Sequence, residues 1–123
     1  MASLTAPEVR AAMEAARQRG DFGVAPRSAA IFKVNERDRA WVDAQCVVQP
    51  IGTMLQPIRL TGARDRIVKK SYIRASAYDS PYFQGYYTAL RKDPAWRCYE
   101  VACGHDVMLD DPDRLTEILL EVA

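Results

Sequence analysis

The chain contains a single histidine, His105, in the segment "EVACGHDVMLDDPDR" near its C-terminal end. A strand-like apolar run ends just before this histidine, and a helix is predicted to begin at Asp111–Pro112. In parallel α/β sheets, catalytic groups gather at the carboxyl ends of the strands. A histidine at such a place can act as a general base near neutral pH. From its position alone, a loop or cap histidine without chemistry is the favoured interpretation.

A general-base histidine needs a carboxylate that orients its ring. Asp79, in "RASAYDSPYF", follows the preceding predicted strand in the same way as His105 follows the next one. Two adjacent parallel strands would then place an acid and a base at one edge of a sheet. Asp106 is a weaker candidate, because neighbouring side chains point apart. Asp79 also suits a turn or cap before the helix predicted to start at Ser80–Pro81.

The three cysteines, Cys46, Cys98 and Cys103, form no C-x-x-C motif. With one histidine, they lack the ligand spacing of a zinc site, so we predict no metal and no cofactor. An odd number of unpatterned cysteines favours free thiols in a reducing compartment, which predicts a cytoplasmic protein.

Composition excludes several classes of partner. The chain has 123 residues, 27% of them charged, and a formal net charge of +1. This weak charge predicts no nucleic-acid partner. No apolar run approaches the roughly 20 residues of a membrane span, and the N-terminus lacks a signal-peptide pattern. We therefore expect one globular domain, or a piece of one, with no membrane association.

The first half of the chain, residues 1–60, is predicted to be helical. "TAPEVRAAMEAARQRG" has Thr5 as a cap and Gly20 as a stop. "NERDRAWVDAQCV" predicts a second helix capped by Asn35, and a short third helix is expected after Pro50.

Residues 61–123 follow a strand–helix–strand–helix order, preceded by a short strand-like piece, "PIRLTG". The first main strand is expected at residues 71–75, the crossover helix from Ser80, the second strand in "WRCYEVAC" and the last helix from Asp111. This order predicts an α/β fold with parallel strands. Two strands alone leave both edges of a sheet bare, so we expect additional chain to complete it.

The segment "CGHDVMLDDPDRLTEILLEVA" resembles the C-terminal end of α/β-hydrolase-fold proteins, in particular bacterial esterase-like enzymes related to plant esterases and hydroxynitrile lyases. "DRAWVDAQCVVQPIGTMLQPIRLTGA" resembles their cap region, and "SYIRASAYDSPYF" resembles the segment that carries the acid of the triad. The resemblance implies a partial α/β-hydrolase fold: a cap-like region at residues 1–60 and the last part of the core at residues 61–123. It implies that His105 is the catalytic base and Asp79 the acid. The resemblance does not distinguish ester hydrolysis from cyanohydrin-lyase chemistry.

The family's nucleophile, a serine in a G-x-S-x-G turn, has no counterpart in this sequence. Glycines flank none of the serines in the required way; these are Ser3, Ser28, Ser71, Ser76 and Ser80. The chain therefore resembles the C-terminal half of such an enzyme. We expect it to be inactive alone and to need an N-terminal half chain, or a second copy of itself, before a small-molecule ester could be turned over.

Two alternatives follow from the same residues. The chain could be a non-catalytic assembly module whose two strands complete a sheet with a partner chain or a second copy. It could also be an unrelated small-molecule binder whose tyrosines, Tyr82, Tyr86 and Tyr87, line a pocket.

Overall fold

The computed structural model describes residues 7–123, so the predicted cap Thr5 lies outside the described residues. Helix α1 spans Pro7–Gln18 and buries Met13. Two residues after its end, Gly20 has a φ of 84°. This left-handed conformation suits glycine and ends the helix, as predicted.

Helix α1 belongs to a small unit with β1 (Gly23–Val24), β2 (Gln49–Pro50) and α3 (Ile51–Leu55). The two short strands pair antiparallel, and Met13, Ile51 and Leu55 form the core. The third helix begins after Pro50, as expected. This unit comprises the described residues up to Arg27 together with Gln45–Leu60.

The second compact unit contains Ser28–Ala44 and Thr61–Ala123. Its first part is a turn that leads into α2 (Glu36–Gln45). Asn35 caps this helix as predicted, because its Oδ1 accepts a hydrogen bond from the backbone N–H of Asp38 at 3.1 Å. The assignment of residues 1–60 to a cap-like region and residues 61–123 to a core stays a prediction.

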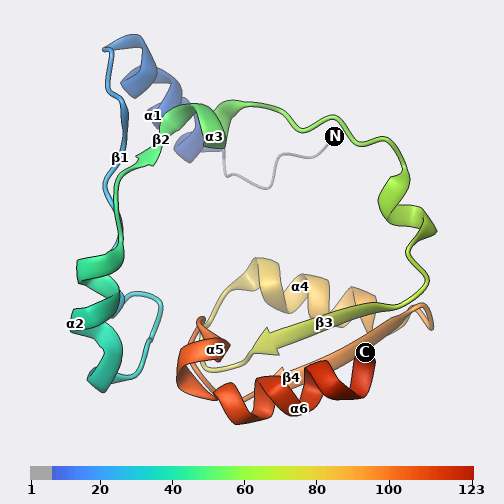
Figure 1. Cartoon of the computed structure of the whole chain (residues 1–123). Helices are drawn as coiled ribbons and strands as arrows, with labels where there is room; N and C mark the ends of the chain where they lie inside the picture. Colours follow the sequence, from blue (N-terminus) through green and yellow to red (C-terminus); the bar gives the residue numbers. More distant parts are fainter. Residues whose placement is uncertain (1–6) are drawn as a thin grey trace. The chain divides into compact units, whose positions relative to one another are not determined.

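Strands β3 (Lys70–Ala75) and β4 (Trp96–Val101) form a parallel pair in which Lys70 lies opposite Trp96. Helix α4 (Pro81–Leu90) makes the crossover between them. The predicted α/β class with parallel strands is confirmed, and it is compatible with a partial α/β fold (Figure 1).

Helices cover both faces of this sheet (Figure 1). On one face, Tyr72 and Tyr87 bring β3 and α4 together, with ring centroids 6.5 Å apart. On the other face, Val101, Val107 and Ile118 form the core between β4, α5 (Val107–Asp110) and α6 (Pro112–Val122). Successive side chains of a strand point to opposite faces of the sheet, which is why the same strands can pack against α4 on one face and against α5 and α6 on the other. Asp111 caps α6 as predicted and accepts a hydrogen bond from the N–H of Arg114.

The strand expected in "PIRLTG" is absent, and this prediction was wrong. Residues 57–62 are irregular, and a short 3-10 helix, η1 (Ala63–Arg66), follows them. Pro57 lacks a backbone N–H for a ladder, and Gly62 has a φ of 75°. An apolar alternation becomes a strand only where a neighbouring strand can accept its hydrogen bonds.

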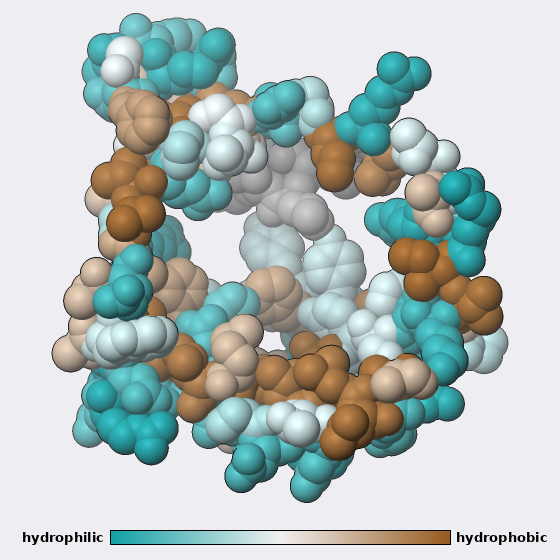
Figure 2. Space-filling view, viewed as in Figure 1, coloured by the Kyte–Doolittle hydropathy of each residue, from teal (hydrophilic) through white to brown (hydrophobic). Residues whose placement is uncertain are grey.

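Large apolar side chains remain at the surface of the second unit. Figure 2 shows a band of apolar side chains along β3 and α6. Val68 is 88% exposed and Leu120 is 74% exposed. Among residues 7–123, no helix is both long enough and apolar enough to span a bilayer.

Candidate functional site

His105 lies in the loop that leaves the carboxyl end of β4, as the sequence predicted. Its backbone N–H donates a hydrogen bond of 2.9 Å to the carbonyl oxygen of Phe32. The loop is therefore held by the turn that precedes α2, a contact that no pattern in the sequence predicted.

Three aromatic rings surround the imidazole of His105. The ring of Phe83, from α4, is nearly parallel to it, with centroids 5.5 Å apart and an interplanar angle of 8°. The ring of Phe32 is stacked at 5.6 Å, and that of Tyr78 is tilted at 4.9 Å. Stacking occupies the faces of a ring and leaves its edge free. The aromatic cage, defined as Phe32, Tyr78 and Phe83, thus limits the orientations of the imidazole.

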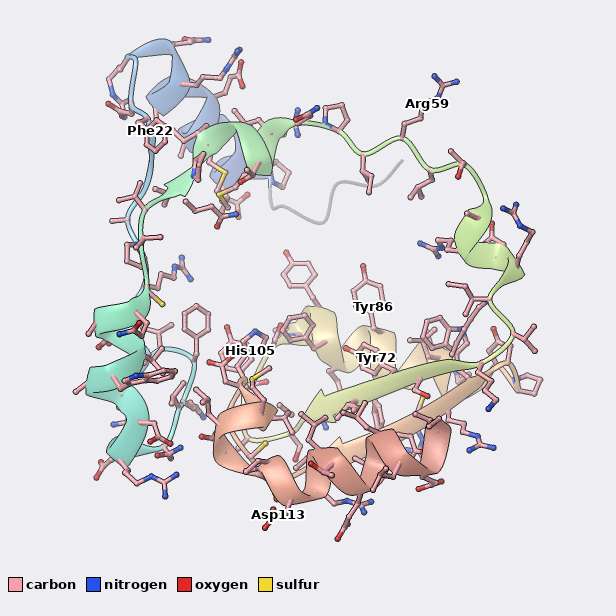
Figure 3. All side chains as sticks on the ribbon, in the orientation of Figure 1. Phe22, Arg59, Tyr72, Tyr86, His105 and Asp113 are labelled. Atoms are coloured by element: carbon pink, nitrogen blue, oxygen red, sulfur yellow. The ribbon has the colours of Figure 1, made fainter. Side chains whose placement is uncertain are left out.

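Both ring nitrogens of His105 are available for chemistry. Neither makes a hydrogen bond within residues 7–123, and no buried side-chain nitrogen in that part of the chain lacks a partner. The nitrogens of this half-buried residue therefore reach solvent. Figure 3 shows His105 beside the first residues of α5 and close to the end of β3.

The loops that follow β3 and β4 lie side by side. The backbone N–H of Ser76 donates to the carbonyl oxygen of Val101 at 2.8 Å, and that of Ala77 donates to Cys103 at 3.1 Å. These bonds bring the segment of Asp79 to the loop of His105, as expected for adjacent parallel strands. Asp79 itself is exposed, and no ion pair or hydrogen bond within the described residues joins it to His105. Its assignment as the acid stays a prediction.

Asp110, the last residue of α5, connects the His105 loop to the turn before α2. Its Oδ2 accepts a hydrogen bond from the backbone N–H of Gly104 at 2.8 Å. Its Oδ1 accepts from the backbone N–H of Asn35 at 2.9 Å and from Nδ2 of Asn35 at 2.8 Å. Asp110 was not predicted as a site residue from the sequence. The only signal was a carboxylate five residues after the histidine, and its partner Asn35 is 75 residues away.

Gly104 is required where these segments meet. A Cβ atom at this position would overlap the carbonyl oxygen of Lys33 and Oδ2 of Asp110. The glycine before the histidine therefore allows the backbone of this loop to pass close to the backbone of Lys33.

Cys103 is a poor nucleophile in this environment. Burial raises the pKa of its thiol, and the negative charges of Asp110 and Asp111 raise it further. Because the thiolate is the reactive form, the raised pKa lowers the reactivity of this cysteine.

A shallow depression of about 180 Å³ runs along β3 to His105. Its walls include four consecutive residues of β3, Tyr72 to Ala75, together with Phe83 and Val107. Among the described residues, β3 pairs with β4 alone. The imidazole thus stands at one end of an open sheet edge. No cluster of three or more His, Cys, Asp or Glu side chains within residues 7–123 could hold a metal ion.

Comparison with known proteins gives one informative similarity. The carbendazim hydrolyzing esterase of Nocardioides sp. (strain SG-4G) is 34% identical to this chain over 94 residues. The similarity supports an esterase-like relation. The matched residues make up 76% of this chain and 39% of that esterase, so the chain spans well under half of its relative. No protein-family model matches the chain, and no solved structure does.

Proposed function

We propose that this chain supplies the general base of an esterase-type hydrolytic site, as the C-terminal portion of an α/β-hydrolase fold. The observation that carries the proposal is the position of His105 in the loop after a parallel strand, with ring nitrogens that make no hydrogen bond within residues 7–123. The similarity to an esterase over 94 residues supports the reaction class.

In the proposed reaction, a serine hydroxyl attacks the carbonyl carbon of an ester while His105 accepts the hydroxyl proton. The tetrahedral intermediate collapses to an acyl-enzyme, and the imidazolium gives its proton to the departing alkoxide, which leaves as an alcohol. Water then attacks the acyl carbon and His105 accepts its proton. The second collapse releases the carboxylic acid, and the proton returns to the serine.

The nucleophile and the oxyanion hole must come from a segment outside these 123 residues, because the sequence contains no G-x-S-x-G turn. The free edge of β3 is where we place the contact with that segment. The unpaired edge of a parallel strand presents free backbone N–H and C=O groups that a further strand can satisfy. The added segment would then cover the depression beside Tyr72 and His105, so that this surface lines an enclosed site.

Asp79 is proposed as the acid that orients the imidazole. Its neighbour Tyr78 lies against the ring of His105, with centroids 4.9 Å apart, which supports a place for Asp79 near this ring. Binding of a segment that carries the nucleophile would favour the approach of Asp79 to His105, because it removes water from this edge.

A non-catalytic assembly module is the second candidate. It is favoured by the exposed apolar side chains of the strand-bearing unit; these include Ile67, Val68, Met108, Leu119 and Leu120. Apolar residues gathered at a surface mark contacts with other chains. This candidate predicts partner binding that does not depend on His105.

A chimera tests the proposal. In the chimera, this chain replaces the segment of the carbendazim hydrolyzing esterase that it matches, and turnover of p-nitrophenyl acetate is measured. We expect turnover by the chimera, and a loss of roughly 10²–10⁴-fold in kcat for its His105→Ala variant, the range for general-base catalysis.

Asp113→Ala in the same chimera is the matched control, since this exposed carboxylate in the first turn of α6 has no proposed role. A folded chimera that turns over ester equally well with and without His105 would contradict the proposal. This chain alone should show no turnover that depends on His105, because it lacks the nucleophile. Its mass by light scattering then reports whether it assembles, as the second candidate requires.

A further inference from the structure

We infer that Asp110 is a positioning residue that holds His105 in its reactive orientation by fastening the loop of residues 102–106 to the turn before α2. The inference rests on the proposed role of His105 as the base. Asp110 does not touch the imidazole and acts through the backbone of Gly104 and through Asn35.

Asp110 joins the loop of Gly104 to the turn of Asn35. The groups of these two segments that face Asp110 cannot hydrogen-bond to each other, because they are all donors. Gly104 offers a backbone N–H, and Asn35 offers its backbone N–H and its side-chain Nδ2. All three are donors, so an acceptor with two separate oxygens is needed between them. A carboxylate has two acceptor oxygens, whereas an amide has one. Asp110 uses one oxygen for each segment.

Two further contacts make the junction rigid. The N–H of His105 donates to the carbonyl oxygen of Phe32 at 2.9 Å. The carbonyl oxygen of Lys33 lies where a side chain of Gly104 would be. Phe32 also supplies one ring of the aromatic cage. The segment that Asp110 fastens is therefore the same segment that supports both the backbone and the ring of His105.

Asn35 extends this junction into α2. Its Oδ1 caps the helix through the N–H of Asp38 at 3.1 Å, while its Nδ2 donates to Asp110 and to Oδ2 of Asp38. The start of α2 and the base-bearing loop consequently share one hydrogen-bonded network. Loss of the Asp110 carboxylate would free the N–H of Gly104 and allow the imidazole to leave the cage.

The sole histidine makes this inference testable in the full chain. The imidazole C–H protons of His105 give one pair of NMR signals, and the neighbouring rings displace them from the positions of free histidine. For Asp110→Asn we expect these signals to move toward free histidine. Amide hydrogen exchange at Gly104 and His105 should become at least about tenfold faster, since hydrogen bonds to a carboxylate are among the strong ones.

Asp113→Asn is the matched control. It removes the same charge from an exposed residue in the first turn of α6, and it should leave both observables unchanged. Methyl signals of Val101 and Ile118 report whether the core is intact. With an intact core, unchanged His105 signals and exchange rates in Asp110→Asn would overturn the inference.

Should Asp110→Asn fail to fold, Asn35→Asp tests the junction from its other side. This variant keeps an acceptor that can cap α2, and it replaces the donor Nδ2 that bonds to Asp110 with a carboxylate oxygen that repels it. The His105 signals should move in the same direction by a smaller amount. Signals that stay in place would overturn the inference here too.

The chimera separates this inference from the proposed function. There Asp110→Asn should lower kcat with little change in KM, because substrate contacts are untouched while the base is misplaced. If His105→Ala leaves the chimera active while Asp110→Asn still moves the His105 signals, the proposed function fails and the positioning of His105 by Asp110 stands.

Discussion

The backbone N–H of His105 bonds to the carbonyl oxygen of Phe32, and the rings of the same two residues stack with centroids 5.6 Å apart. One residue thus supports both the main chain and the side chain of the candidate base. Phe32 precedes His105 by more than half the chain, so this support forms only in the folded protein.

Phe32→Ala should release the imidazole while leaving the backbone bond possible. We expect a loss of about 1 kcal/mol or more in the free energy of unfolding, since aromatic pairs contribute about 0.5–1.5 kcal/mol each beyond their buried area. The His105 NMR signals should also move. Phe22→Ala is the control: this ring is 77% exposed, so its removal should cost less than about 0.5 kcal/mol. Equal effects of the two substitutions would contradict the described packing.

Gly104→Ala should be strongly destabilising, because its Cβ would overlap the carbonyl oxygen of Lys33 and the carboxylate of Asp110. We expect a loss above about 1 kcal/mol, measured by urea denaturation. Gly85→Ala, within α4, has open space around its Cβ. It should stabilise the chain by about 0.5–1 kcal/mol, the advantage of alanine over glycine in a helix. The opposite order of the two variants would refute the close approach at Gly104.

Ile118→Ala tests the core that supports β4 and the His105 loop. Ile118 is fully buried against Val101 and Val107, and its truncation should cost about 2–5 kcal/mol. Leu120, two residues along α6, is 74% exposed, and Leu120→Ala should stay within about 0.5 kcal/mol of the parent. Thermal unfolding followed by circular dichroism distinguishes them, and a small cost for Ile118→Ala would contradict the assigned face of α6.

Cys103 should alkylate only at high pH. Burial, and then the charges of Asp110 and Asp111, raise the pKa of its thiol. The rate of iodoacetamide labelling should therefore increase only at a higher pH than it does for an ordinary thiol. Between the pKa of this thiol in the unfolded chain and its raised pKa in the folded chain, the folded state binds more protons. The free energy of unfolding should therefore fall as pH increases through that window.

The Cys103→Ala variant should lose this part of the pH dependence. Mass spectrometry of labelled peptides gives the rate for each cysteine separately. A labelling midpoint of Cys103 at or below that of an ordinary thiol would show that the described environment is wrong.

Local signals in the sequence determined most of the elements. Gly20 ended α1, Asn35 capped α2, Pro50 preceded α3 and Asp111 capped α6, because each acts on backbone groups within a few residues. The strand–helix–strand order likewise determined the parallel pair and placed His105 and the segment of Asp79 at one edge.

Tertiary structure decided what local patterns could not. The apolar piece "PIRLTG" found no strand to pair with and stayed irregular. The link from Asp110 to Asn35 spans 75 positions, and the ring of Phe32 reaches His105 over a similar separation. No periodicity or capping rule encodes such contacts, because they depend on how separate segments pack. The sequence by itself determined which residue could serve as the base, and only the folded chain decided what holds that residue in place.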